Sequence, residues 1–317
     1  MLYTRRELGK LALAALPASR LLEPAAVLAR AKPNSNFAGV QIGINVPYSY
    51  GSNMMSADDV LSATVKLGVS SVELRSQPVE QFLGVAPGLL TGGGRGAQTP
   101  EQIAARQAAA AELEKWRLAA PMSKAKDFRK KYEDAGVSIE IVKYDNILNF
   151  SDGVLDYAFE LARTLGARAI SCELPVNQVE ASKRLGQFAG KHKMMVGFHG
   201  HTQMTPAIWE QAFTYSKYNG ANLDIGHFVG GNKTSPVPFL KEHHDRITHL
   251  HVKDKTLKDV NVPFGQGDTP IKECLQLIRD NKWQIQGTIE FEYPVPQGSD
   301  RMTEIARCVQ YCKEALA

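Results

Sequence analysis

The segment "ANLDIGHF" (residues 221–228) combines the pattern of a buried strand with residue types found at reactive sites. Leu223 and Ile225 are apolar and two residues apart, which is the spacing of a strand with one face in a core. Asp224 lies between them, and His227 follows three residues later. A carboxylate and an imidazole at the end of a buried strand are costly unless a partner compensates them. The segment therefore predicts a strand that ends at a functional site.

Strand-like segments of this kind recur along the chain and alternate with helical ones. They cover residues 40–46, 71–76, 137–145, 168–175, 193–201, 221–228, 247–255 and 287–294. Eight strand–helix alternations over about 250 residues predict an α/β fold, a single (β/α)8 TIM barrel. A doubly wound open sheet is the alternative, but "NVPYSYGSN" (45–53) after the first strand is not a glycine-rich phosphate loop.

One stretch interrupts the alternation, between the second and third predicted strands. It contains the glycine-rich "GLLTGGGRGAQ" (88–98) and then a helical pattern over 99–120. The loop follows the carboxyl end of a strand, where TIM barrels carry their active sites. We therefore expect an insertion after the second strand, and it acts either as a lid or substrate wall or as a solvated addition.

The first 31 residues differ in character from the rest. Arg5 and Arg6 precede an apolar stretch, Leu11 to Leu16, and Ala29 and Ala31 are small residues two apart. This pattern is typical of a twin-arginine export signal, with a short amphipathic helix as the alternative. We expect residues 1–31 to be a signal peptide, residues 38–317 to form the barrel domain, and the mature protein to reside in the periplasm.

The charge of the chain argues against nucleic acid as a partner. Residues 1–31 carry five Lys/Arg and two Asp/Glu, so they contribute +3 of the formal net charge of +4. The remainder is near +1, whereas nucleic-acid-binding domains usually carry a strong basic surplus. No apolar run approaches the roughly 18 residues of a membrane span. We expect no nucleic acid and no membrane for the mature protein, and leave a homo-oligomer open.

Ionisable side chains are concentrated at the carboxyl ends of the predicted strands. They are Glu73 and Arg75, Glu173, His199 and His201, Asp224 with His227, then His249, His251 and Lys253, and finally Glu290 and Glu292. Side chains near the ends of barrel strands point into the mouth, where they meet. A divalent cation accepts imidazole and carboxylate ligands together, so the set predicts a metal site. Asp224 is the expected ligand, and His227 is expected at the rim, contacting ligand, water or substrate.

Three motifs, "LDIGH", "HLHVKD" and "IEFE", lie in this order near strand ends. With "NVPFGQGDTPIKECLQLIRDNKW" (261–283), they resemble the xylose isomerase-like TIM barrel superfamily over roughly residues 38–315. This superfamily includes sugar and sugar phosphate isomerases and epimerases, inosose dehydratases and the endonuclease IV type of barrel. The order and spacing of the motifs carry the resemblance, since none is specific alone.

The resemblance implies a ligand set for the metal. In ketose 3-epimerases of the superfamily, an Asp, a His and a Glu from successive strands bind the cation, and these correspond to Asp224, His251 and Glu290. A fourth ligand, a Glu from the fifth strand, is replaced by His199 in this chain. Either His199 takes that position or Glu173 on the adjacent strand supplies the carboxylate. One divalent metal is expected, with Mn²⁺ favoured over Co²⁺, Zn²⁺ or Mg²⁺.

The resulting functional expectation is a divalent-metal-dependent sugar isomerase or epimerase that removes a proton next to a carbonyl to give an enediolate. The expected catalytic residues are Glu173, Glu290 and His199, and the expected substrate-binding residues are Glu73, Arg75, His201, His227, Lys253 and Glu292. The alternative is a metal-dependent lyase or dehydratase of a keto sugar or 3-keto-glycoside. A non-catalytic sugar-binding barrel and an AP endonuclease are disfavoured by the full ligand set and by the near-neutral charge, respectively. The expected partner is a small carbohydrate substrate.

Overall fold

The computed structural model describes residues 32–52, 54–90, 99–174, 176 and 178–317. The expected export signal, residues 1–31, lies outside the described residues, as do residues 91–98 of the glycine-rich loop. Within the described part of the chain, none of the helices has the length and apolar character needed to cross a membrane.

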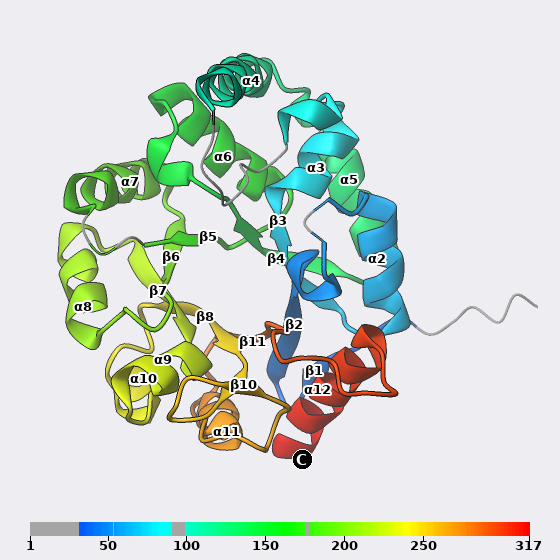
Figure 1. Ribbon diagram of the computed structural model, residues 1–317, viewed down its shortest axis with the longest axis vertical. Coiled ribbons are helices and arrows are strands. Elements are labelled where there is room, and N and C mark those ends of the chain that lie inside the picture. The colour runs from blue at the N-terminus through cyan, green and yellow to red at the C-terminus, as the bar shows by residue number, and fades with distance from the viewer. Residues whose placement is uncertain (1–31, 53, 91–98, 175, 177) are drawn as a thin grey trace, which may run out of the picture. The chain divides into compact units, whose positions relative to one another are not determined.

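Eight parallel strands among the described residues form a closed barrel, which confirms the predicted (β/α)8 fold (Figure 1). The strands are β2 (Val40–Val46), β3 (Ser71–Arg75), β4 (Ser138–Lys143), β5 (Ala169–Glu173), β6 (Met195–His199), β7 (Asn219–Asp224), β8 (Ile247–Val252) and β11 (Gln286–Ile289). Neighbours pair in the order β2-β11-β8-β7-β6-β5-β4-β3, and pairing of β2 with β3 closes the ring. A short β1 (Asn36–Phe37) pairs antiparallel with β2.

Helices follow the strands and surround the barrel as an outer ring (Figure 1). They are α2 (Ala57–Lys66), α3 (Ser76–Leu83), α4 (Pro100–Leu118), α5 (Met122–Asp134), α6 (Asp152–Thr164), α7 (Val179–His192), α8 (Pro206–Tyr215), α9 (Ile225–Asn232), α10 (Val237–Glu242), α11 (Ile271–Asn281) and α12 (Arg301–Ala315). In the part of the chain that the structure describes, three short 3₁₀ helices, Tyr48–Tyr50, Pro87–Leu89 and Ile147–Asn149, lie in the connections.

Several strands are shorter than the sequence pattern predicts, because the polar residues at their ends begin other structures. The predicted strand 221–228 ends at Asp224, whose side chain caps α9. The predicted strand 247–255 ends at Val252, and β9 (Asp254–Lys255) then pairs with β10 (Asn261–Val262). Glu290 and Glu292 lie beyond the end of β11 rather than within it.

The predicted insertion lies between β3 and β4 and includes α4 and α5. A capping box begins α4, in which Thr99 Oγ1 accepts from the Gln102 backbone and the Gln102 side chain accepts from the Thr99 backbone. None of the residues of α4 is buried. The helix is attached by Trp116, which packs partly buried against the core, and by Arg117, whose guanidinium forms two hydrogen bonds, of 2.7 and 3.1 Å, to the fully buried Glu80 carboxylate on α3.

Alternation along the strands separates an apolar layer from a polar lumen. On β8, Leu250 and Val252 belong to the hydrophobic core shared with the helices. His251, between them, contacts Glu73 on β3, three positions away around the ring, so both side chains face the lumen. The lumen is therefore lined with ionisable residues where many TIM barrels carry branched apolar ones.

Candidate metal centre

The site is built around Asp224, at the junction of β7 and α9. Its Oδ1 atom accepts a 2.7 Å hydrogen bond from the His227 backbone N–H, which caps the helix. This contact fixes the carboxylate and leaves Oδ2 directed into the lumen. One carboxylate oxygen caps a helix and the other faces the lumen, which explains why Asp224 interrupts an otherwise apolar strand.

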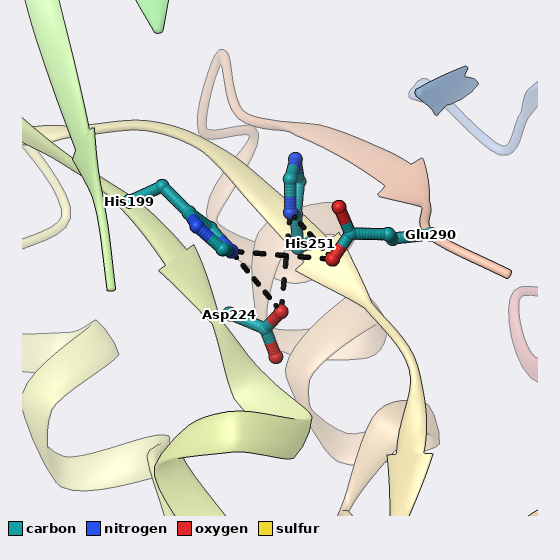
Figure 2. Close-up of side chains that lie close together, drawn as sticks. All are labelled: His199, Asp224, His251 and Glu290. Atoms are coloured by element: carbon teal, nitrogen blue, oxygen red, sulfur yellow. Dashed lines mark hydrogen bonds and ion pairs between the residues drawn. The ribbon is translucent and has the colours of Figure 1, made fainter. Parts of the chain in front are cut away.

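Four side chains, from β6, β7, β8 and the segment that follows β11, converge in the lumen: His199, Asp224, His251 and Glu290 (Figure 2). His199 Nε2 lies 3.4 Å from Asp224 Oδ2 and 4.0 Å from Glu290 Oε2. His251 Nδ1 lies 3.1 Å from Glu290 Oε2 and 3.9 Å from Asp224 Oδ2. All four donor atoms lie within 4.8 Å of one another, and all four residues are buried.

Each of the two imidazoles has a carboxylate at its other nitrogen. Glu173 lies 3.0 Å from His199 Nδ1, and Glu73 lies 2.5 Å from His251 Nε2. A carboxylate that accepts from one ring nitrogen fixes the orientation of the ring and directs its other nitrogen at the site. His199 Nε2 and His251 Nδ1 are therefore the nitrogens available to the cluster.

Lys253 brings a positive charge to the same carboxylates. Its Nζ atom lies 3.0 Å from Asp224 Oδ2, 2.6 Å from Glu290 Oε2 and 2.8 Å from Glu292 Oε2. Burial alone would raise the pKa of Asp224 and Glu290. The positive charges around them outweigh burial and hold both pKa values below the usual range: chiefly Lys253 for Asp224, and His251 and Lys253 for Glu290.

The histidines of the lumen differ in their protonation. Burial disfavours charge on His251, but the carboxylates of Glu290 and Glu73 outweigh it and raise its pKa to about 10. Burial lowers the pKa of His227 and of His249 to about 4, so both rings are neutral at pH 7. A cation bound at His251 Nδ1 would take the place of a proton there.

The structure places Glu173 beside the cluster, on the β5 and β6 side of the mouth. Its carboxylate contacts His199, Lys143 Nζ at 2.9 Å and His201 Nε2 at 3.2 Å. Burial opposes ionisation of Glu173, but His199 and Lys143 lower its pKa below the usual range. The histidine, and not this carboxylate, shares the space with Asp224, His251 and Glu290.

The other predicted substrate-binding residues occupy different positions. Glu73 is fully buried beneath His251, so its contact is with the imidazole. Arg75 forms two hydrogen bonds, of 2.7 and 3.0 Å, to Asp145 at the mouth. His201 is half exposed, whereas Lys253 is buried between carboxylates. Of this predicted set, Glu292 lines an open cleft.

This cleft, about 480 Å³, lies beside the cluster on the β2 and β11 side. It is lined by Tyr48, Gly51, Ser52, Asn261, Phe291, Glu292 and Arg301. Tyr48 Oη donates a 2.8 Å hydrogen bond to Glu292 Oε1, and Asn261 Nδ2 donates to Glu292 Oε2 at 3.4 Å. Glu292 therefore joins the cleft to Lys253 and, through it, to the cluster.

Sequence reasoning missed Tyr48, Asn45, Asn261, Arg301 and Lys143. Asn45 Nδ2 donates a 2.7 Å hydrogen bond to Glu290 Oε1, and Lys143 holds Glu173. Asn45 and Lys143 occupy lumen-facing positions near the ends of predicted strands, so the alternation rule could have found them. Tyr48 begins a three-residue 3₁₀ helix, Asn261 begins the two-residue strand β10, and Arg301 begins α12. At such positions no periodicity marks the side that faces the site.

The donor set fits a divalent cation. His251 Nδ1 and Glu290 Oε2 are buried and have no hydrogen-bond partner of good geometry. Both atoms form ion pairs, but buried polar atoms without a well-formed hydrogen bond are rare and commonly mark an ion or a water. Two imidazole nitrogens and two carboxylate oxygens suit Mn²⁺, Co²⁺ or Zn²⁺ better than Mg²⁺, which prefers oxygen ligands alone.

The sequence and the fold were compared with those of known proteins. The model of the xylose isomerase-like TIM barrel family matches residues 107–314, which include the four clustered side chains. The chain therefore belongs to the xylose isomerase-like TIM barrel family. No curated protein sequence matches it.

Solved structures of the same fold include enzymes with different chemistries. A xylose isomerase domain protein from Planctomyces limnophilus is 14% identical, with a TM-score of 0.59 over 88% of this chain and 97% of that one. A probable 3-DHS dehydratase from Bacillus anthracis is 12% identical, with a TM-score of 0.59 over 86% and 99%. A 3-keto-D-glucoside 4-epimerase from E. coli is 10% identical, with a TM-score of 0.55 over 87% and 99%. At these sequence identities the comparison shows a shared fold and no more.

Proposed function

We propose that the protein is a divalent-metal-dependent carbohydrate isomerase or epimerase that removes a proton next to a carbonyl. The observation that carries this proposal is the convergence of His199 Nε2, Asp224 Oδ2, His251 Nδ1 and Glu290 Oε2 within 4.8 Å. These four residues would hold the metal, with Mn²⁺ favoured. When bound, the cation would polarise the substrate carbonyl and stabilise the negative charge that develops on proton removal.

The side chains around the cluster supply candidates for proton transfer on two sides. Epimerisation needs a base on one face of the carbon and an acid on the other. Glu173 ends β5, and Glu290 and Glu292 follow β11; in the closed ring of eight strands β5 and β11 are four positions apart. Carboxylates on opposite walls are the arrangement that this chemistry requires.

Within this proposal the carboxylates divide their roles. Glu173 keeps His199 in the ligating tautomer and, with the half-exposed His201, faces the mouth. Glu292 lines the cleft and is held by Tyr48 and Lys253, so it is placed to exchange a proton with a bound substrate. Glu290 is directed at the metal by Asn45.

A lyase or dehydratase acting on a keto sugar or keto-glycoside is the second candidate, and the cleft favours it. Burial, followed by the charges of Glu292 and Glu290, raises the pKa of Tyr48, so its hydroxyl remains a proton donor at neutral pH. A donor in a cleft of about 480 Å³ beside the cluster could protonate a leaving group there. The relatives named above include an epimerase and a dehydratase.

The partner in either case is a small carbohydrate. We further propose that residues 1–31 direct export, so that the enzyme acts on free sugars or glycosides in the periplasm. The paired Arg5 and Arg6 ahead of an apolar stretch support this location.

Hydrogen exchange in D₂O tests the proposed function. The Mn²⁺-loaded protein is incubated with a panel of ketoses and keto-glycosides, the metal is removed with a chelator, and the products are examined by NMR. An isomerase or epimerase should incorporate deuterium at a carbon next to the carbonyl without loss of any group. An unsaturated sugar together with released water or aglycone would replace this assignment with the lyase. Absence of exchange and of product across the panel would contradict both.

A further inference from the structure

Lys253 contacts two of the candidate metal ligands directly. Its ammonium is within 3.0 Å of both Asp224 Oδ2 and Glu290 Oε2, and only 2% of the residue is exposed. These are the same two oxygens that face His199 Nε2 and His251 Nδ1. The ammonium and a metal ion would therefore bind the same carboxylate atoms.

Two cations cannot share these oxygens without a cost. A buried carboxylate needs a positive partner, and Lys253 provides one for both Asp224 and Glu290. A divalent ion held by the same atoms would repel an ammonium at that distance strongly, because the surroundings are shielded from water. One of the two cations must withdraw when the other binds.

Lys253 has other partners to which it can withdraw. Its Nζ atom also lies 2.8 Å from Glu292 Oε2 and 3.1 Å from His227 Nε2. The 3.1 Å distance places His227 Nε2 where an imidazole nitrogen can accept a hydrogen bond from the ammonium. The side chain can thus give up Asp224 and Glu290 while its charge stays compensated.

We propose that Lys253 is an internal counter-cation, which holds Asp224 and Glu290 in place before metal binds and yields these two contacts to the incoming ion. The inference rests on the metal centre of the proposed function. It implies that the lysine lowers the affinity for metal while it stabilises the metal-free fold. A lysine that served substrate binding alone would do neither.

Metal affinity of Lys253→Met and Lys253→Gln tests this inference. Both variants remove the charge, and glutamine keeps a hydrogen-bond donor. Titration of metal-free protein with Mn²⁺ should give a dissociation constant at least tenfold lower in both variants than in the wild type. The thermal midpoint of the metal-free variants should fall, and the rise of the midpoint on adding Mn²⁺ should be larger than in the wild type.

Lys255→Met is the matched control, since Lys255 is equally buried but contacts His227 and Asp259. Its dissociation constant for Mn²⁺ should stay within threefold of the wild-type value. If both Lys253 variants fold poorly without metal, Mn²⁺ should restore them, because the ion replaces the missing charge.

Unchanged or weaker Mn²⁺ binding in the Lys253 variants, with one ion still bound by the wild type, would overturn this inference and leave the metal centre standing. Failure of Mn²⁺ to restore misfolded variants would overturn it as well. Absence of Mn²⁺ binding by every protein, wild type included, would remove the metal centre itself.

Discussion

The Oε2 atom of Glu73 lies 2.5 Å from Nε2 of His251, and both side chains are fully buried in the lumen. The contact joins β3 to β8 across the barrel. It sets the orientation of an imidazole whose other nitrogen faces Glu290. Within the proposed function, Glu73 would therefore act on the candidate metal site through His251.

Replacing Glu73 with Gln should weaken metal binding. The amide cannot accept from His251 Nε2 as strongly as a carboxylate, so the ligating tautomer of the ring loses support. Loss of such a supporting carboxylate typically costs about 10–100-fold in metal affinity. Titration with Mn²⁺ measures the effect. Glu140→Gln, which alters a pair with Arg168 outside the site, is the control, and equal affinities of the two variants would contradict the role of Glu73.

Asp224 combines two functions that different substitutions separate. Asp224→Asn keeps an acceptor for the His227 N–H and so preserves the cap of α9, but it removes the charge that binds metal. Asp224→Ala removes both and should cost a further ~0.5–2 kcal/mol of unfolding free energy. Elemental analysis should find both variants depleted of metal, and denaturant unfolding of metal-free protein should find the alanine variant less stable. Full metal content in either variant would exclude Asp224 from the centre.

Arg117 should contribute strongly to stability although it lies far from the site. It is the ion-pair partner of the fully buried Glu80 and joins α4 of the insertion to α3. Breaking a buried pair by removing one partner typically costs about 3–5 kcal/mol, so Arg117→Met should lose that much in urea unfolding. Arg129→Met breaks an exposed pair with Glu133 and should change stability by less than about 0.5 kcal/mol. Similar losses in the two variants would show that the burial of Glu80 does not govern the effect.

Export is tested at the twin arginines. If residues 1–31 form the proposed signal, the double substitution Arg5→Lys and Arg6→Lys should retain the precursor in the cytoplasm of a bacterial host. Fractionation and immunoblotting of the full-length chain measure its location. Delivery of the double variant to the periplasm at the wild-type level would contradict the proposal.

The barrel could be predicted from the sequence because its evidence is local and repeated. All eight predicted strand segments overlap a strand of the structure, and the alternation seen in Leu250, His251 and Val252 correctly separated core from lumen. The ends of the strands were less predictable. The residues after Asp224 and after Ile289 carry strand-like patterns, but capping and loop contacts decide their structure.

Contacts across the lumen could not be derived from the sequence. The spacing of residues on one strand shows which side chains face the lumen. It does not show which side chains of other strands they contact there. The pairing of Glu73 with His251 and the insertion of Lys253 among three carboxylates depend on the closure of the ring. Tyr48 and Asn261 reach Glu292 from a three-residue 3₁₀ helix and a two-residue strand, which are too short to show a sequence period.

The central claim is a metal centre formed by four side chains: His199, Asp224, His251 and Glu290. The most direct test of this claim is whether His199 or Glu173 is the fourth ligand. The decisive measurement is the Mn²⁺ stoichiometry and affinity of His199→Asn beside those of Glu173→Gln, each prepared metal-free and then titrated. The account predicts that His199→Asn loses binding by at least tenfold. Glu173→Gln should still bind one ion, with affinity reduced only through the support that Glu173 gives to His199. Full binding by His199→Asn together with loss of the ion in Glu173→Gln would contradict the account.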